Sequence, residues 1–497
     1  MSLDRSKNRH AGRILVVLAL VLATGCGKLG ARSDASKLPA ASAVLTVDTS
    51  RPGYEFAPGA VGLSTEASEL GAGYLRAQDH RLVRLMRLLG PSVLRIGGNV
   101  DRSWWTSHGE RAPAWATSIV TPANLSSLHR LLRATGWRVL LGVDLGHFEP
   151  ARVADEVRHA SKIFGRDLAG IEIGNEPDGF SKRGIHLRPS TYNVHRYLHE
   201  AEIYRQVVNA AAPGVAIDGP ALSETRWLTE MGAAVRIFTQ ITQHYYPFNT
   251  CVVSALSNPQ PTALALLSPA VRQQEDETLS TLARVAALAG RSRRIGETNS
   301  VGCQPSVDAN PAFAGALWSL DWALRAGRDG VRGLNFWGLL TCDSYTESPI
   351  CAADQKAAEA GDIVAQPEYY GLLAARQLEG GRFVATRVSA SHSIPNLTTW
   401  ATLAANGTIK IAIIDMVTGG AAQSVSLRIA GYRATQETLV APSIEATSGI
   451  ALGDAMVTSS GQWRPRPVKL SSGSFATVIV HPGSAAILTL RPTRAHG

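Results

Sequence analysis

The sequence predicts an α/β protein, a (β/α)8 TIM barrel followed by a C-terminal all-β sandwich domain. Before about residue 340, short apolar runs of strand length alternate with segments whose apolar residues recur at helical spacing. After about residue 370 the helical spacing stops, and short alternating runs are separated by Gly, Ser, Asn and Pro. The length of 497 residues is that of a two-domain protein.

Eight apolar runs are expected to form the barrel, each followed by a helix or a connecting loop. The predicted strands are Ala60–Glu66, Ser92–Gly98, Arg138–Leu145, Ala169–Gly174, Gly214–Asp218, the end of Ala234–Tyr246, the start of Arg293–Ser300, and Gly330–Trp337. The predicted helices are Leu82–Leu89, Leu125–Thr135, Ala151–Phe164, Thr191–Ala211, Leu279–Ala289 and Ala312–Ala326.

The C-terminal part reads as a supporting β-sandwich, because it offers no paired acids and no histidine cluster. Its predicted strands are Thr398–Ala404, Ile409–Ile414, Val425–Ile429, Ala476–Val480 and Ala485–Leu490. We therefore divide the chain into a barrel at 44–372 and a β-domain at 373–497. A strand at Ala43–Val47 could join either domain.

Residues 1–25 have the pattern of an export signal. Four cations precede an apolar core of 11 residues, Ile14–Thr24, which is too short to span a membrane. The sequence Leu22–Cys26 resembles a bacterial lipoprotein box, so we expect Cys26 to carry a lipid, residues 26–43 to be a flexible tether, and the protein to be exported and anchored to the bacterial cell envelope. Ordinary signal cleavage is the alternative.

The charge balance excludes little. The formal net charge is +9, and removal of residues 1–25 takes away four cations and one anion, which leaves +6. This suits an acidic substrate as well as any basic protein. No Lys/Arg stripe is interleaved with aromatic residues, so we expect no nucleic-acid partner. Neither a phosphate-binding Gly-Lys-Ser/Thr loop nor a dinucleotide fingerprint occurs, and we expect no cofactor.

Four cysteines remain after Cys26, namely Cys251, Cys303, Cys342 and Cys351. An even number suits an oxidising compartment, and four cysteines allow three pairings. Cys342–Cys351 would close a short loop, and Cys251–Cys303 would then link two further loops. Reduced thiols are the alternative.

The stretch Ala169–Phe180, AGIEIGNEPDGF, is the strongest functional signal. Pro177 stops the apolar strand, so Glu176 is placed at the strand's carboxyl end, where an α/β barrel keeps its chemistry. The stretch Arg293–Ser300, RRIGETNS, has the same form around Glu297, which lies 121 residues further on (297 − 176). Two carboxylates held over one pocket are what glycoside hydrolysis needs, one as acid and one as nucleophile. The alternative is that the two acids end their strands by coincidence.

Together the motifs SVLRIGGN, GIEIGNEPD, HYY and GETNS, with the helix that begins near Phe313, resemble glycoside hydrolase family 79. This is the β-glucuronidase and heparanase family of retaining barrel hydrolases. The stretch Gly449–Trp463 resembles its C-terminal β-domain. The resemblance runs in outline from about Val44 to Leu490, and it implies a barrel whose catalytic acids end strands four and seven.

The resemblance also implies roles for single residues. Glu176 matches the acid/base and Glu297 the nucleophile, and we expect burial and the Glu297 anion to raise the pKa of Glu176. Asn175 matches the residue that binds the sugar 2-hydroxyl, and Tyr245 the tyrosine that holds the nucleophile. Glu66 matches an acid that contacts the distal hydroxyls, and Asn99 matches a polar residue in the same pocket wall.

The loop after Glu297 is where a relative would bind the sugar carboxylate. The donors expected here are the N–H groups of Gly302 and Cys303, the side chain of Gln304 and the phenol of Tyr345. Gly302 stands where the family has a tyrosine, and Trp337 stands where many relatives have His. An interior Arg95–Glu172 pair is expected to stiffen the site rather than touch substrate.

His195 and His199 are four residues apart on a predicted helix, but no Glu follows His195, and we expect no metal site. The resulting prediction is a retaining exo-β-glycosidase of the β-glucuronidase type, acting on glycans or glycosides that carry a terminal β-linked uronic acid. Two alternatives stay open. One is a β-glucosidase or β-xylosidase of the same clan, and the other is a non-catalytic glycan-binding lipoprotein.

Overall fold

The computed structural model describes residues 43–182, 186–249, 261–302, 312–343, 345–390, 394–470 and 473–493. Residues 40–497 form one compact unit. Among the helices of the described residues, none is both long and apolar enough to cross a bilayer. The predicted signal peptide, the lipid on Cys26 and the tether as far as residue 42 lie outside the described residues. They stay predictions, which the intact mass of the mature chain would test.

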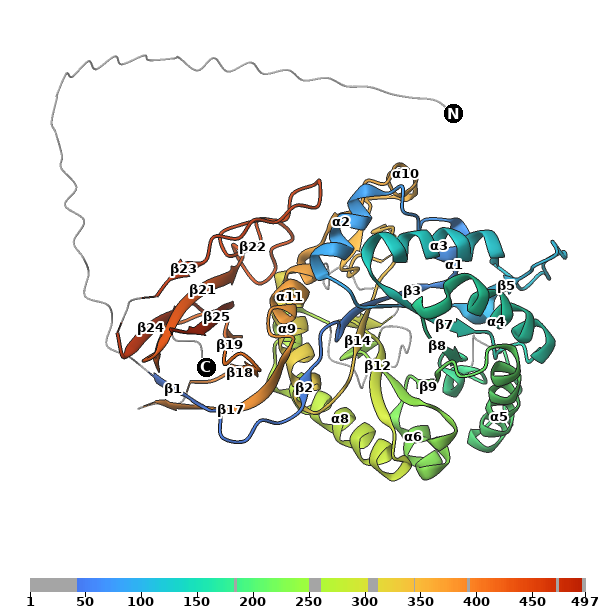
Figure 1. Cartoon of the computed structure of the whole chain (residues 1–497), viewed down its shortest axis with the longest axis horizontal. Coiled ribbons are helices and arrows are strands. Elements are labelled where there is room, and N and C mark those ends of the chain that lie inside the picture. Colours follow the sequence, from blue (N-terminus) through green and yellow to red (C-terminus); the bar gives the residue numbers. More distant parts are fainter. Residues whose placement is uncertain are drawn as a thin grey trace, which may run out of the picture. The chain divides into compact units, whose positions relative to one another are not determined.

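Eight parallel strands close into a barrel, which confirms the predicted fold class (Figure 1). In chain order they are β3 (Val61–Glu66), β4 (Val93–Gly98), β7 (Arg138–Val143), β8 (Leu168–Ile173), β9 (Ile217–Leu222), β10 (Gln240–Tyr245), β12 (Ser292–Thr298) and β14 (Leu334–Trp337). Strand β14 pairs with β3 and closes the ring. Nearly every residue of these strands is buried, because helices cover the outside of a parallel barrel.

The helices lie around the barrel (Figure 1). They are α1 (Ala67–Ala72), α2 (His80–Leu89), α3 (Pro122–Thr135), α4 (Pro150–Phe164), α5 (Val194–Ala211), α6 (Thr225–Met231), α7 (Ala263–Leu266), α8 (Pro269–Ala289), α9 (Phe313–Arg328), α10 (Gln355–Ala360) and α11 (Pro367–Arg376). Helix α8 begins ten residues before the predicted Leu279, because its first turns are too polar to show apolar periodicity. Its start is marked instead by the Ser268 cap and by Pro269.

Strands five and six differ from the prediction. Strand β9 runs to Leu222 rather than Asp218, since Gly219 and Pro220, which read as a strand breaker, stay in the strand through a cis peptide bond. Strand β10 begins only at Gln240. The residues before it form α6 and a 3-10 helix, Gly232–Ile237.

The described residues also include strands of only two or three residues. They are β2 (Glu55–Phe56), β5 (Ser103–Trp105), β6 (Ser118–Val120), β11 (Phe248–Asn249), β13 (Val301–Gly302), β15 (Ile350–Cys351), β16 (Val364–Ala365), β22 (Ala451–Leu452) and β23 (Val468–Lys469). The other 3-10 turns are Val100–Arg102, Gly165–Asp167 and Pro177–Gly179.

The C-terminal domain is a β-sandwich, as predicted. Its main strands are β1 (Ala43–Asp48), β17 (Gly381–Ala390), β18 (Leu397–Ala404), β19 (Ile409–Asp415), β20 (Gln423–Arg428), β21 (Tyr432–Val440), β24 (Phe475–Val480) and β25 (Ser484–Pro492). Strand β1 pairs with β17 and β20, so the strand before the barrel belongs to this domain. After the barrel, the next main strand of the domain is β17, which begins eight residues after the predicted boundary at 373.

Strand β17 passes from one layer of the sandwich to the other. Its first residues pair with β18, and its last six pair with β1. The alternation along β19 shows the result. Ile411 and Ile413 face the core between the two layers, whereas Ala412 and Ile414 belong to the large apolar cluster of the barrel.

Helix α9 joins the two domains. It is buried on all sides from Phe313 to Gly327, which is why its sequence is apolar all round. Helix α11 packs closely against it, since a Cβ on Gly371 would lie 2.1 Å from the carbonyl oxygen of Ala316. A side chain at residue 371 would push the two helices apart.

A buried ion pair at Asp321 links α9 to the β-domain. One carboxylate oxygen accepts hydrogen bonds from Thr398 Oγ1 and Trp400 Nε1, both at 2.7 Å. The other oxygen lies 3.0 Å from Arg325 Nη2, and Arg325 also contacts Glu275. The side chain of Asp321 is 2% exposed. Loss of this carboxylate would leave buried donors without a partner.

We expect Asp321→Ala to lower the free energy of unfolding by about 3 kcal/mol, the usual cost of breaking a buried pair by removing one partner. Thermal unfolding followed by circular dichroism would measure the effect. The control is Asp329→Ala, which removes a half-exposed partner of Arg328 and should cost less than about 1 kcal/mol. Equal melting temperatures for the two variants would contradict this role of Asp321.

Candidate active site

The two predicted glutamates meet at the carboxyl ends of β8 and β12. An oxygen of Glu176 and an oxygen of Glu297 lie within 4.8 Å of each other, in a group that also includes a ring nitrogen of His244. The side chain of Glu176 is 35% exposed and that of Glu297 is 9% exposed. Glu297 therefore lies deeper in the site than Glu176.

The backbone at Glu176 is held in an uncommon conformation. Its φ is 49°, in the left-handed region that non-glycine residues seldom adopt, and Gly174 has φ 78°. The N–H of Glu176 donates to the carbonyl of Ala221 at 2.9 Å, and Pro177 begins a 3-10 turn directly afterwards. The neighbouring strand and the turn thus hold the strained residue, and such strain is typical of functional sites.

Arg95 is the centre of the polar network under the site. This fully buried side chain, which comes from β4, contacts Glu172 through Nε and Glu297 through Nη1, each at 2.6 Å. Its Nη2 donates to Asn175 Oδ1 at 2.9 Å, so the amide nitrogen of Asn175 is left as the donor. The predicted Arg95–Glu172 pair is confirmed. Its extension to Glu297 and Asn175 is new, and it makes Arg95 a positioning residue for both.

The guanidinium of Arg95 stays charged inside the barrel. Burial lowers the pKa of the Arg95 guanidinium, but the charges of Glu172 and Glu297 raise it more, so the pKa is raised overall. The guanidinium therefore stays cationic, and its hydrogen bond to Glu297 Oε2 is charge-assisted.

The tyrosine that holds Glu297 is Tyr246, and the prediction of Tyr245 is wrong. Tyr246 donates from its hydroxyl to Glu297 Oε1 at 2.8 Å. Tyr245 points to the other side of β10, where its hydroxyl reaches the carbonyl of Val271 and its ring lies 4.7 Å from that of Trp322. Side chains alternate along a strand, so adjacent tyrosines face opposite ways, and the sequence HYY does not show which one faces the pocket.

His244 was not predicted as a site residue. It lies in β10, two residues before Tyr246, which directly follows the strand. Its Nδ1 lies 3.0 Å from Glu176 Oε1 and 3.9 Å from Glu297 Oε1. Burial lowers the pKa of His244, and the charge of Glu297 opposes this effect. The pKa is lowered overall, so the neutral ring is favoured. A neutral ring can donate to ionised Glu176 or accept from protonated Glu176. The two-residue spacing to Tyr246 is the sequence feature that could have indicated it.

The pKa of Glu176 is raised, as predicted. The main cause is burial, which Arg95 and Lys182 oppose and Glu224 reinforces. The predicted contribution of Glu297 is not among these causes. Glu176 is thus the carboxyl of the pair whose surroundings favour the protonated form.

Glu66 and Asn99 lie together, and their contact with substrate stays a prediction. The amide of Asn99 donates to Glu66, and Ser68 Oγ donates to the same oxygen at 3.2 Å. Burial raises the pKa of Glu66, and the hydrogen bond from Asn99 lowers it. Trp337 lies close by, since a Cβ on Gly98 would be 3.1 Å from its Nε1 and 3.0 Å from Glu66 Cγ. Among the described residues this indole N–H has no partner.

The structure describes only two of the four residues predicted to donate hydrogen bonds to a sugar carboxylate, Gly302 and Tyr345. Cys303 and Gln304 lie outside the described residues, and so does Cys251 with its proposed pairing to Cys303. Gly302 lies in β13, paired with Asn249, and its contact with substrate stays a prediction. Tyr345 is only 2% exposed, and its hydroxyl donates to the carbonyl of Val301 at 2.5 Å, so the predicted donation to a sugar is wrong.

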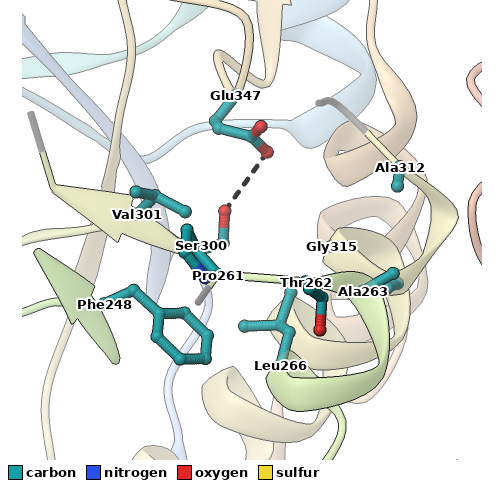
Figure 2. Close-up of a pocket in the computed structure, with 11 residues that line it drawn as sticks. Phe248, Pro261, Thr262, Ala263, Leu266, Ser300, Val301, Ala312, Gly315 and Glu347 are labelled. Carbon is teal, nitrogen blue, oxygen red and sulfur yellow. Dashed lines mark hydrogen bonds between the residues drawn. The ribbon is translucent and has the colours of Figure 1, made fainter. Parts of the chain in front are cut away.

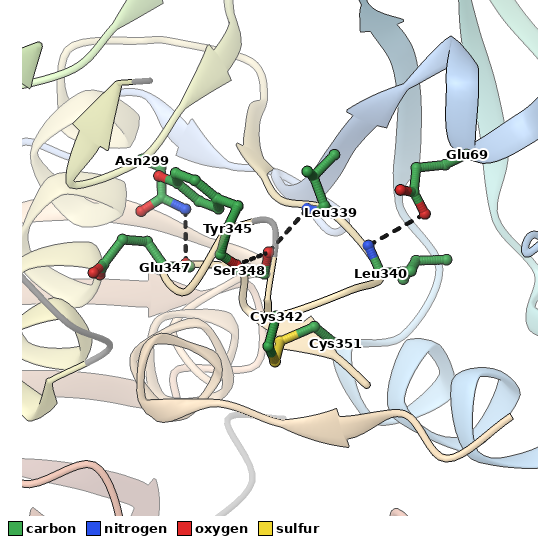
Figure 3. Close-up of a disulfide and its surroundings, with 9 residues drawn as sticks. All are labelled: Glu69, Asn299, Leu339, Leu340, Cys342, Tyr345, Glu347, Ser348 and Cys351. Carbon is green, nitrogen blue, oxygen red and sulfur yellow. Dashed lines mark hydrogen bonds between the residues drawn. A yellow bond between two sulfur atoms is a disulfide. The ribbon is translucent and has the colours of Figure 1, made fainter. Parts of the chain in front are cut away.

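The loop that carries Tyr345 is closed by a disulfide between Cys342 and Cys351, which confirms the predicted pairing (Figure 3). Within the loop, Ser348 Oγ donates to the carbonyl of Tyr345 at 3.0 Å and accepts from the N–H of Leu339 at 2.9 Å. The loop therefore holds Tyr345 in a supporting position behind the strand that follows Glu297.

A small cavity lies beside this loop, lined by Phe248, Leu266, Val301 and Gly315 (Figure 2). Its polar edge is a hydrogen bond of 3.2 Å from Ser300 Oγ to Glu347. A volume of about 20 Å³ leaves room for roughly one water molecule. The cavity is too small for a sugar ring, so we do not assign it to substrate.

One group among the described residues has donor atoms close enough for a metal ion, namely Glu176, His244 and Glu297. The Arg95 guanidinium lies 2.6 Å from Glu297 and would repel a cation there. The three residues therefore fit acid–base chemistry better than metal binding. His195 and His199 are both exposed on α5, and neither belongs to a metal-binding group of the described residues.

The chain matches no model of a known protein family. No curated protein sequence matches it either. Solved structures resemble it over most of its length, and they are glycosidases by their own descriptions. A 4-O-α-L-rhamnosyl-β-D-glucuronidase from Fusarium oxysporum 12S is 17% identical with a TM-score of 0.67, covering 89% of this chain and 98% of its own.

Two further structures extend the comparison. The GH51 arabinofuranosidase of Xanthomonas axonopodis pv. citri is 14% identical with a TM-score of 0.64, and 91% of this chain and 100% of that chain are covered. CelM2, a bifunctional glucanase-xylanase from a metagenome library, is 13% identical with a TM-score of 0.60, and the coverage is 91% and 99%. At these identities the likeness shows the fold, a barrel with a β-sandwich domain.

Proposed function

We propose that the protein is a retaining glycoside hydrolase whose acid/base is Glu176 and whose nucleophile is Glu297. One observation carries the proposal. The two carboxylates lie within 4.8 Å of each other at the carboxyl ends of barrel strands. Retaining enzymes hold their carboxyl groups about 5 Å apart, whereas inverting enzymes leave room for a water between them.

In the first step the Glu297 carboxylate attacks the anomeric carbon, and the glycosidic bond breaks as Glu176 gives its proton to the leaving oxygen. In the second step Glu176, now ionised, takes a proton from water. That water attacks the anomeric carbon and releases Glu297. Arg95 and Tyr246 hold the two oxygens of Glu297, so that the attacking carboxylate is fixed before substrate arrives.

Within this class we propose an exo-acting β-glucuronidase-type specificity. The support is the resemblance of the motifs around Glu176 and Glu297 to family 79, together with the fold of the Fusarium glucuronidase. The unpartnered indole N–H of Trp337 beside Glu66 is a further donor for a sugar oxygen. A neutral-sugar glycosidase is the second candidate, favoured by the arabinofuranosidases of the same fold.

Hydrolysis of a panel of nitrophenyl glycosides would test this proposal. The panel holds the β-D-glucuronide, β-D-glucoside, β-D-xyloside and β-D-galactoside, with the α-L-arabinofuranoside added. We expect cleavage of the glucuronide, and a loss of at least about 1000-fold in kcat for Glu297→Gln, which cannot form the covalent intermediate. Cleavage of a neutral sugar instead would keep the mechanism and reject the glucuronide. No cleavage by the wild type would favour a glycan-binding protein.

Adjacent tyrosines provide a matched test of the site geometry. Tyr246→Phe removes a hydrogen bond to a charged carboxylate, worth about 1.5–3 kcal/mol, so kcat/KM should fall about 10- to 100-fold. Tyr245→Phe removes a hydrogen bond to a backbone carbonyl on the far side of β10, and kcat/KM should be unchanged. Equal losses in the two variants would contradict the assignment of Tyr246.

The pH profile should respond to the Lys182–Glu224 pair, whose atoms lie 2.7 Å apart. Lys182 lowers the pKa of Glu176 and Glu224 raises it. Glu176 must be protonated in the free enzyme, so activity is lost as the pH rises through its pKa. Lys182→Gln should move this alkaline limb of kcat/KM to higher pH, and Glu224→Gln should move it to lower pH. The shifts should be small because the pair is exposed, and shifts of the same sign would exclude Glu176 as the acid.

A further inference from the structure

A cleft on the opposite end of the barrel from Glu176 and Glu297 is lined by arginines. It lies where strands β12 and β14 begin, so it is at the amino ends of the strands, whereas the two glutamates are at the carboxyl ends. The cleft has a volume of about 460 Å³, within the range of small-ligand sites. Its charged and aromatic lining residues are Tyr54, Glu55, Arg291, Arg293, Arg332 and Arg382.

Three separate segments bring these four arginines together. Arg291 follows α8, Arg293 lies in β12, Arg332 lies in the turn before β14, and Arg382 lies in β17. Glu55 is the one carboxylate among the lining residues. The ion pairs of the described residues include none of these four arginines, although acids elsewhere on the surface pair with neighbouring cations. The cleft thus concentrates uncompensated positive charge.

Arg293 gives the strongest indication of a bound ligand, because it has a buried donor without a partner among the described residues. It is half-buried, its Nε has no hydrogen-bond partner among the described residues, and its guanidinium carbon lies 5.8 Å from the centre of the Tyr54 ring. A buried donor without a partner costs free energy that a bound acceptor would recover. Arg291 is partly engaged, since it donates to the carbonyl of Arg236 at 2.9 Å. Among the described residues, the side-chain donors left for a ligand are therefore those of Arg293, Arg332 and Arg382.

We propose that this cleft binds an oligosaccharide that carries carboxylates. Guanidinium groups bind carboxylates through paired hydrogen bonds, and several of them in one cleft fit a ligand with several anions. Tyr54, which is 58% exposed, adds a flat apolar face beside the cations. A concave site favours a soluble chain over a flat bilayer surface. The choice of a carboxylated sugar over other anions rests on the proposed function. The arginine lining of the cleft is observed independently of that proposal.

A second site on the far end of the barrel would hold an acidic polymer without blocking the two glutamates. The protein would stay on a uronate-rich glycan between rounds of hydrolysis, and the local concentration of chain ends would rise. A small nitrophenyl substrate is too short to reach both ends of the barrel and would gain nothing from the cleft.

Isothermal titration of the full mature chain with tetragalacturonate would test the proposal, with maltotetraose as the neutral control ligand. We expect binding of the acidic ligand that weakens between 50 and 500 mM salt. Binding should weaken at least about tenfold in Arg293→Gln/Arg332→Gln, because two charge-assisted contacts are lost. The matched control is Arg464→Gln/Arg466→Gln, which removes the same charge from exposed residues of the β-domain and should bind as the wild type does.

Several outcomes would overturn the proposal. They are equal affinity in the wild type and Arg293→Gln/Arg332→Gln, orthophosphate binding as tightly as tetragalacturonate, and arginine-dependent binding of phosphatidylglycerol vesicles without binding of tetragalacturonate. If circular dichroism shows that the double variant is unfolded, the exposed Arg382→Gln replaces it and should weaken binding about threefold. Hydrolysis of the nitrophenyl glycoside should be unchanged in the cleft variants. The wild type could bind tetragalacturonate, with binding lost in the arginine variants, and yet hydrolyse none of the nitrophenyl glycosides. That result would reject the proposed function and keep the cleft.

Discussion

The buried Arg95 guanidinium is the interaction on which the site depends. It is the only cation that directly contacts Glu172 and Glu297 among the ion pairs of the described residues, and it also fixes Asn175. Burial penalises a charged carboxylate, and a cation in direct contact offsets that penalty. Arg95 gives this contact to Glu297 in its deep position. The apolar barrel around Arg95 has a low local dielectric, which strengthens the hydrogen bonds of this network.

The two glutamates occupy different surroundings for this reason. Glu297 is held by Arg95 and Tyr246, both of which favour a negative charge. Glu176 is more exposed to solvent but has no cation in direct contact among the ion pairs described, and its neighbour is a neutral His244. One carboxyl is thereby suited to be an anion and the other to carry a proton. This separation of roles is what a retaining mechanism requires.

The β-domain supports this arrangement from outside the barrel. Helix α9, buried on every side, lies between the barrel and the sandwich, and Asp321 ties it to β18. The ring of Trp322 on the same helix packs against Tyr245, which lies between His244 in β10 and Tyr246 directly after the strand. The inner face of strand six is therefore positioned in part by a helix that the β-domain holds in place.

The sequence alone predicted the barrel, the sandwich, the strand-end positions of the two glutamates, the interior Arg95–Glu172 pair and, as one of several possibilities, the Cys342–Cys351 disulfide. The barrel, the sandwich and the two strand ends rest on local patterns, namely apolar periodicity and strand-ending turns. Only the tertiary structure decided which of two adjacent tyrosines faces the pocket, that Tyr345 uses its hydroxyl on the backbone, and that His244 lies beside Glu176. Each of these depends on the direction of a side chain from its strand. A shift of one residue reverses that direction, and neighbouring strands, not local sequence, set the register. The arginine cleft is the extreme case, because its four cations come from segments that only folding brings together.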